Sequence, residues 1–300
     1  MKQKALVTGG TGFIGTNLLL RLLKEGWDVF CLVRSQFRLS SEFLSQGVKE
    51  VVCPNSTEEY VSVLKLINPS VVFHLASLFI GQHKTCQVSD LIESNVHFGT
   101  KLLEAMSCAG VKRIVNTGTS WQHFNNEDYN PVCLYAATKQ AFEDILKFYV
   151  HSENFQSITL EIFDTYGPND FRPKILPTLL NLKKDDPEIL LSPGEQKLDF
   201  VYIDDVIECF VLSGLELSSK KNAQGDFKKF CVRTGNPIKL KELVEMIEKL
   251  KDFKLPVKLG GRAYRPREVM EAYPFGNNPP YWLPKIGLTE GLKKTIHRII

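Results

Sequence analysis

The feature that most constrains the fold of this chain is a short apolar run that closes on a glycine turn near the N-terminus. KALVTGG (4–10) has the pattern of a buried strand, and TNLLLRLLKEG (16–26) follows with the leucine spacing of a helix. The connection places glycines at three-residue steps, at Gly9, Gly12 and Gly15. Strand, glycine turn and helix in this order are typical of dinucleotide-binding folds, because the turn lets backbone N–H groups approach a pyrophosphate. We therefore predict a dinucleotide site at this turn.

Strands and helices alternate through the first half of the chain. Strand-like runs lie at residues 28–34, 49–54, 69–77, 112–120 and 157–168, and helical patterns lie between them, at 57–67, 94–110 and 134–145. This alternation indicates crossover connections between parallel strands. The predicted fold is α/β, a Rossmann-type doubly wound parallel sheet that helices cover on both faces.

The alternation becomes irregular after residue 167. Prolines and glycines become frequent, as in DFRPKILP (170–177) and YRPREV (264–269). We predict an NADP-binding Rossmann domain at residues 1–166, to which a later segment at about 198–215 returns. Residues 167–300 would mainly form a smaller C-terminal lobe that binds the substrate.

Charge and cysteine content exclude several classes of protein. The net charge is only +3, with mixed signs along the chain, which argues against nucleic-acid binding. The seven cysteines are odd in number and form no CxxC pair, a pattern that indicates reduced thiols in the cytoplasm and no metal site. The apolar run at the start is too short for a signal peptide or a membrane span.

The end of the second predicted strand bears on the choice of cofactor. NAD-binding folds tend to place an acid there, whereas this chain has Arg34 and Ser35, with Arg38 nearby. A guanidinium suits a 2′-phosphate as a forked donor, so we favour NADP and keep NAD as the alternative. Asn55, after the third strand, is a candidate contact to the adenine.

The stretch LYAATKQAFEDI (134–145) places Tyr135 and Lys139 four residues apart on one helix face. On its own, such a pair is compatible with a solvated helix surface. In the order of the whole chain, however, it joins a set of further motifs: TGGTGFIG (8–15), VVFHLAS (71–77), ESNVHFGTKLLEAM (93–106), NTGTS (116–120), YGP (166–168) and LDFVYIDDV (198–206). Together these segments resemble an extended short-chain dehydrogenase/reductase of the NAD-dependent epimerase/dehydratase group, whose members act on nucleotide sugars.

The resemblance implies a set of site residues. Thr119, Tyr135 and Lys139 would be catalytic, with Ser120 as the reserve for Thr119. Tyr135 would give a proton to a carbonyl oxygen, and we expect Lys139 to lower the pKa of the phenol. The implied cofactor-binding residues are Gly9, Thr11, Gly12, Phe13, Ile14, Gly15, Arg34, Ser35, Asn55, Leu75, Ala76, Ser77, Asn95, Thr117, Tyr135, Lys139 and Tyr166. The implied substrate-binding residues are Ser120, Lys197 and Arg265, with Arg267 as the alternative to Arg265.

Two positions narrow the reaction within this group. Ser120 and Trp121 stand where related 4,6-dehydratases carry an Asp-Glu pair, and Trp121 replaces the cysteine of the epimerase-reductases that resemble GDP-fucose synthase. The segment 120–145 is most similar to reductases of nucleotide-linked 4-keto-6-deoxyhexoses such as CDP-abequose and CDP-paratose synthases. We therefore expect an NADPH-dependent 4-ketoreductase of deoxysugar and O-antigen biosynthesis, with CDP favoured over dTDP or GDP.

Two other readings stay open. One is a nucleotide-sugar C4 epimerase, which needs the same Tyr and Lys, and the other is a non-catalytic NAD(P)-sensing protein on the same fold. The resemblance also implies a homodimer, because the helices around 93–109 and 135–152 pair across a two-fold axis in relatives.

Overall fold

A seven-stranded parallel sheet forms the centre of the computed structural model, which describes residues 2–34, 38–219 and 224–296. Its spatial order is β11-β6-β5-β4-β1-β2-β3, and each neighbouring pair is parallel. The strands are β1 (Lys4–Thr8), β2 (Asp28–Val33), β3 (Lys49–Val52), β4 (Val71–His74), β5 (Arg113–Thr119), β6 (Gln156–Ile162) and β11 (Asp226–Val232). The predicted doubly wound parallel sheet is confirmed.

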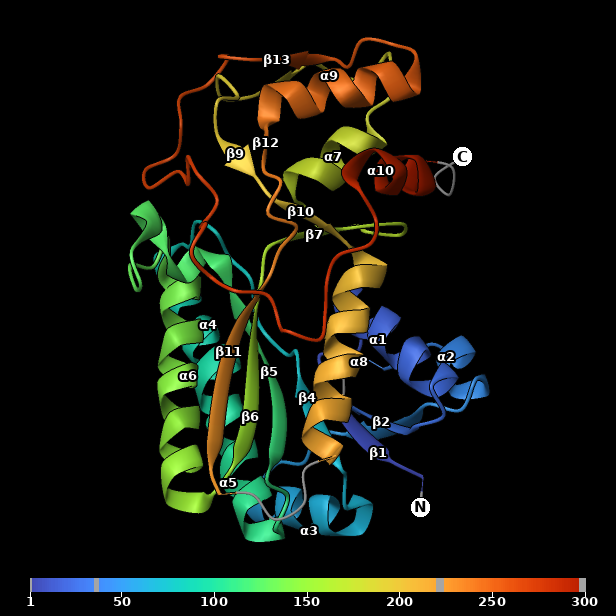
Figure 1. Ribbon diagram of the computed structural model, residues 1–300, viewed down its shortest axis with the longest axis vertical. Coiled ribbons are helices and arrows are strands. Elements are labelled where there is room, and N and C mark those ends of the chain that lie inside the picture. Colours follow the sequence, from blue (N-terminus) through green and yellow to red (C-terminus); the bar gives the residue numbers. More distant parts are fainter. Residues whose placement is uncertain (1, 35–37, 220–223, 297–300) are drawn as a thin grey trace.

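Helices cover both faces of this sheet (Figure 1). On one face lie α1 (Phe13–Lys24) and α8 (Ile203–Ser219), and on the other α3 (Thr57–Ile67), α5 (Phe98–Ala109) and α6 (Leu134–Glu153). Alternate residues of β1 feed the two cores, since Ala5 and Val7 join the cluster with α1 and α8, whereas Leu6 joins the cluster with α3, α5 and α6. Burial on both faces explains why this strand reads as a continuous apolar run.

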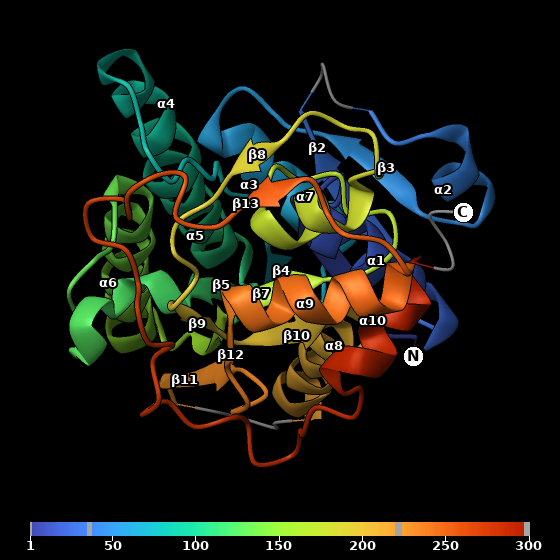
Figure 2. The same ribbon diagram turned by 90° about the horizontal axis from the view of Figure 1, so that it is seen from above.

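A smaller lobe lies over the end of the sheet where the parallel strands finish (Figures 1 and 2). It contains three two-stranded pairs: β7 (Asp164–Tyr166) with β10 (Phe200–Tyr202), β9 (Lys197–Leu198) with β12 (Ile238–Lys239), and β8 (Ile189–Leu190) with β13 (Val257–Lys258). Its helices are α7 (Ile175–Asn181), α9 (Leu240–Lys251) and α10 (Leu288–Ile296). This placement puts the lobe beside the loops that carry function in open α/β sheets.

The edge strand β11 was not anticipated from the sequence. The segment expected to return to the sheet, about 198–215, overlaps α8, but residues 226–232 also return and pair with β6. DFKKFCV carries two adjacent lysines, and much of the strand is only half-buried. An edge strand needs no continuous apolar pattern, so its sequence resembles that of a polar loop.

Two further short α-helices are α2 (Ser41–Ser45) and α4 (Val88–Ile92), and short 3-10 helices lie at Thr85–Gln87, Ser120–Gln122 and Phe124–Asn126. Helix α4 continues through a π-helical turn at Glu93–His97 into α5. Among the described residues, no helix combines the length and the apolar character needed to cross a lipid bilayer.

Candidate active site

The glycine turn between β1 and α1 forms a cradle of bare backbone. Gly9 has a φ of +71°, and a Cβ there would lie 2.6 Å from the backbone nitrogen of Ala76. A Cβ on Gly15 would lie 2.1 Å from the carbonyl oxygen of Gly9, so the helix packs directly on the turn. Gly12 is the N-cap of α1 and offers no side chain to its first N–H groups. These N–H groups are open to an anion, which is the requirement of a dinucleotide pyrophosphate.

A cavity of about 320 Å³ opens next to this turn, between the sheet and the lobe. It brings together eight of the residues expected from the sequence: Ile14, Leu75, Ser77, Thr117, Thr119, Ser120, Tyr135 and Lys139. They come from the start of α1, the ends of β4 and β5, and the first two turns of α6. The carboxyl edge of the sheet therefore gathers the predicted cofactor and catalytic groups at one place.

Tyr135 presents its ring to this cavity from the first turn of α6. The ring of Phe79 packs edge-on against it, with centroids 5.0 Å apart. Burial raises the pKa of the phenol to about 12, although hydrogen bonding by the side chains of Ser77 and Thr119 acts in the opposite direction. Our expectation of a phenol with a lowered pKa is wrong for the protein by itself. Tyr135 is a protonated acid at neutral pH.

Lys139 lies one turn further along the same face and is only 2% exposed. Burial lowers the pKa of its ammonium to about 8, and the Glu143 carboxylate opposes this shift. The raised pKa of Tyr135 comes mainly from burial of the phenol itself. The place of Lys139 in the cavity is suited to the ribose hydroxyls of a dinucleotide.

Thr119 ends β5 and is held by the turn that follows. Its Oγ1 accepts a hydrogen bond from the Trp121 N–H (3.3 Å), and its own N–H donates to Gln122 Oε1 (3.1 Å). Gln122 is fully buried and also donates to Gln140 Oε1 on α6 (2.7 Å). This amide ties the strand that carries Thr119 to the helix that carries Tyr135, so the two hydroxyl groups are kept in register.

Two other predicted cofactor residues, Asn95 and Asn55, do not line the cavity. Asn95 is buried behind its wall, where its amide bonds the Leu78 backbone (2.7 and 3.0 Å), Ser77 Oγ (3.2 Å) and Thr138 Oγ1 (2.9 Å). It therefore positions the loop that bears Ser77. Asn55 is exposed and receives a bond from Lys101 at its carbonyl oxygen (3.1 Å).

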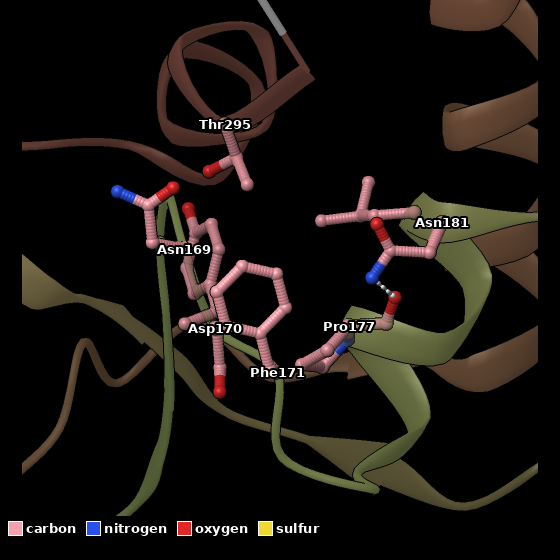
Figure 3. A pocket seen from close by; sticks show the side chains of 9 residues that line it. Asn169, Asp170, Phe171, Pro177, Asn181 and Thr295 are labelled. Atoms are coloured by element: carbon pink, nitrogen blue, oxygen red, sulfur yellow. Dashed lines mark hydrogen bonds between the residues drawn. The ribbon is translucent and has the colours of Figure 1, made fainter. Parts of the chain in front are cut away.

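Tyr166 points away from the catalytic cavity. Its hydroxyl donates to the carbonyl oxygen of Leu288 (3.3 Å), and its ring packs edge-on against Phe200 and Tyr202. It lines a second cavity of about 180 Å³ in the lobe, together with Asn169, Phe171 and Thr295 (Figure 3). The structure thus places the Tyr166 side chain in the lobe, while residues 162–165 line the catalytic cavity.

The structure describes only part of the predicted 2′-phosphate site. Arg34 follows β2 and is exposed, whereas Ser35 lies outside the described residues. Arg38 pairs with Glu50, which holds it against the end of β3. Thr11 is exposed on the glycine turn, and the Phe13 ring beside it lies 4.5 Å from the guanidinium of Arg172.

The predicted substrate residues separate into different places. Ser120 lines the cavity, but Lys197 lies on β9 and pairs with Glu271 (3.1 Å). Arg265 forms a two-pronged pair with Glu268 (3.0 and 2.8 Å) and lies over the Trp121 ring at 5.7 Å, beside the cavity. Arg267, the alternative, bonds the carbonyl oxygen of Pro131 (2.8 Å).

Ten lining residues of the cavity were not predicted as site residues, and Phe79, Trp121, Arg172 and Lys174 are among them. Arg172 is anchored on Asp170 (2.7 and 2.8 Å), and Lys174 lies 3.6 Å from Asp164. Both cations follow the YGP segment within a few residues, and that proximity was a usable signal. Phe79 had no comparable signal, because only the fold of its loop turns it toward Tyr135.

Fold and site together define a Rossmann-type oxidoreductase that uses a nicotinamide dinucleotide, since the glycine cradle and the acid–base pair meet at one cavity. The chain belongs to the NAD dependent epimerase/dehydratase family, whose family model matches residues 5–224.

Curated relatives share almost the full length of the chain. A CDP-abequose synthase of Yersinia pseudotuberculosis is 31% identical over 271 residues, which cover 89% of this chain and 91% of the relative. A CDP-abequose synthase of Salmonella muenchen is 28% identical over 307 residues, which cover 99% of this chain and 98% of the relative. The likeness therefore includes the lobe as well as the sheet.

Solved structures share the fold. A UDP-glucose 4-epimerase of Thermotoga maritima, solved with UDP-glucose, has a TM-score of 0.82 and 21% identity to this chain, with 99% of this chain and 98% of that chain covered. At 21% identity, this similarity shows a shared fold and nothing about the reaction.

Proposed function

We propose that this enzyme reduces the C4 ketone of a nucleotide-linked 4-keto-6-deoxyhexose with NADPH. The observation that carries the proposal is the convergence of Thr119, Tyr135 and Lys139 on one cavity that also reaches the glycine turn at Ile14. The resemblance of the whole chain to CDP-abequose synthases supports a CDP-sugar and a place in O-antigen biosynthesis.

The side chains of the cavity suit proton delivery to a ketone oxygen. The bound cofactor would supply the hydride. Tyr135 holds a proton at its phenolic oxygen at neutral pH, because burial raises its pKa to about 12. Thr119 offers a second hydroxyl at the same place, which orients the accepting oxygen. The proton from Tyr135 would then neutralise the negative charge that develops on the ketone oxygen.

One part of the cavity wall suits a sugar diphosphate. Arg172 and Lys174 line it, and each is held near a carboxylate that fixes its position. Guanidinium and ammonium groups are the usual partners of phosphate oxygens. We assign the diphosphate to these two cations, with Arg265 at the rim.

The wall near Tyr135 is aromatic, with Lys174 Nζ 5.3 Å from the Phe79 ring and the Arg265 guanidinium 5.7 Å from the Trp121 ring. Phe79 packs on Tyr135, and the Trp121 ring lies 5.4 Å from the Phe79 ring. A methyl group at C6 would fit this aromatic surface, whereas a C6 hydroxyl would lose its hydrogen bonds with water there. This supports a 6-deoxy sugar as the substrate.

The test is NADPH oxidation with CDP- and dTDP-linked 4-keto-6-deoxyglucose, with product analysis at C4. Stoichiometric NADPH consumption with reduction at C4 supports the proposal. Inertness toward both substrates over a range of cofactor concentrations contradicts it.

A second candidate is a nucleotide-sugar C4 epimerase, because the same acid and lysine serve transient oxidation at C4 and the family includes epimerases. Incubation with UDP-glucose in place of the keto sugars separates the two reactions. An epimerase interconverts the C4 alcohols of UDP-glucose and UDP-galactose with no net NADPH consumption.

Arg34 gives a prediction about cofactor preference. We propose that its guanidinium, at the end of β2, binds the 2′-phosphate of NADPH. Arg34→Ser should raise KM for NADPH about 10- to 100-fold, as expected for loss of a charge-assisted hydrogen bond, and leave KM for NADH nearly unchanged. Steady-state kinetics with both cofactors measure this. A parent enzyme with an equal or lower KM for NADH would refute the preference.

We also propose a homodimer in the cytoplasm. All seven cysteines are free thiols, as expected in a reducing compartment. Phe148 on α6, one of the two helices that would meet a second copy, is an exposed apolar side chain. Light scattering of the purified chain would measure the mass, and a monomer at micromolar concentration would contradict the dimer.

A further inference from the structure

A row of charged side chains extends from α6 to the edge strand β11, behind the cavity. Glu143 on α6 and Glu161 on β6 are 1% and 2% exposed. Lys229 of β11 lies between them, with Nζ 3.5 Å from Glu143 Oε1 and 3.2 Å from Glu161 Oε1. His123 closes the row at 2.9 Å from Glu161. Burying carboxylates is unfavourable unless they are paired, so each member constrains the next.

Glu143 is the member of the row that faces the catalytic groups. It follows Lys139 by four residues, so both side chains lie on the same face of α6. Gln122 Nε2 lies 3.5 Å from Glu143 Oε2, and Gln122 Oε1 receives the N–H of Thr119. The carboxylate therefore lies one helical turn from Lys139 and is linked through one amide to the strand end that bears Thr119.

We propose that Glu143 acts on the buried ammonium of Lys139 from one helical turn away and keeps it charged for the cofactor. A cation that is 2% exposed needs a nearby anion, and a carboxylate acts strongly where water is excluded. In agreement, Glu143 raises the pKa of Lys139 against the effect of burial, and the net value is about 8. The inference rests on the proposed role of Lys139 but not on the identity of the sugar.

The other groups around this pair do not replace Glu143. From β4, His74 is neutral, because burial lowers its pKa to about 3. Along α6, Tyr135 is a neutral phenol, and Lys147 pairs with Glu143 at 3.0 Å. From β11 and β6 come Lys229 and Glu161, which pair with each other. In a Glu143→Gln variant, Lys229 keeps Glu161 and Lys147 keeps Asp144 (3.3 Å), so the fold retains its other pairs.

The experiment follows two properties against pH: kcat/KM with whichever substrate is turned over, and the Kd for NADPH measured by fluorescence. In Glu143→Gln the alkaline limb of both profiles should move about one pH unit lower, the size of effect expected for loss of one nearby charge at intermediate dielectric. Below the limb, the variant should match the parent. Asp144→Asn is the matched control, because its carboxylate is adjacent in sequence but 60% exposed, and its limb should not move.

A second variant predicts the opposite shift. Lys229→Gln removes a cation that competes for Glu143, so the alkaline limb should move to higher pH. This variant also tests the inference if Glu143→Gln does not fold. An unmoved limb in the folded Glu143 variant, or an equal shift in Asp144→Asn, would overturn the proposal. Because the NADPH profile needs no sugar, failure of the substrate assignment remains distinguishable from failure of this role.

Discussion

Replacing Tyr135 with Phe lowers kcat for ketone reduction by about 10²- to 10⁴-fold, the usual contribution of a positioned acid, and leaves NADPH affinity close to the parent value. The substitution removes the phenolic oxygen but keeps the ring that packs on Phe79. Because the raised pKa keeps Tyr135 protonated at neutral pH, the parent enzyme has its proton in place before the substrate binds. Stopped-flow reduction and fluorescence titration with NADPH measure the two quantities separately.

Tyr129→Phe is the control for this result. Tyr129 lies on the loop before α6, and its side chain is 49% exposed, so loss of its hydroxyl should leave kcat unchanged. Parental turnover by Tyr135→Phe would show that another group delivers the proton, and the mechanism would then be wrong.

Gly15→Ala should destabilise the protein and abolish cofactor binding together. The new Cβ would lie 2.1 Å from the Gly9 carbonyl oxygen and 2.7 Å from Gly10 Cα, and both are backbone atoms of the turn. Overpacking of this kind costs about 1–3 kcal/mol, which for a chain of this size lowers Tm by roughly 2–10 °C. Thermal unfolding with and without NADPH measures both effects.

Gly12→Ala separates binding from stability at the same turn. Its Cβ would meet only the Gly9 carbonyl oxygen, at 3.4 Å, and its φ of −84° suits any residue. Tm without cofactor should therefore stay within about 2 °C of the parent, while Kd for NADPH rises at least about tenfold, because the methyl occupies the phosphate approach. If Gly12→Ala bound NADPH as tightly as the parent does, the glycine turn would not be part of the cofactor site.

The sheet was predictable because its signal is local. In β1 and β4 each run of apolar residues is short and is buried on both faces, so the pattern alone identifies them. β11 was not predictable, since an edge strand with Lys228 and Lys229 has no such run. Its position beside β6 depends on a contact some 70 residues away in the chain.

The candidate site was predictable where spacing along one element defines it. Tyr135 and Lys139 share a helix face, and the glycine steps define a turn. The proposed phosphate contacts were not predictable. Lys197 pairs with Glu271 and Arg265 pairs with Glu268, whereas the loop after β7 brings Arg172 and Lys174 into the cavity lining. The direction of the Tyr135 pKa was also mistaken, since burial depth cannot be read from residue spacing.

The outermost position of β11 has a consequence for how the chain folds during synthesis. Strand β6 is complete at Ile162, yet its outer edge stays open until Asp226–Val232 has left the ribosome. Helix α8, which covers one face of the sheet, also emerges only after the lobe has begun. A fragment that stops at residue 166 would carry an unprotected β-edge and an uncovered apolar face, and both favour aggregation. We therefore expect the two halves of this enzyme to become stable only together.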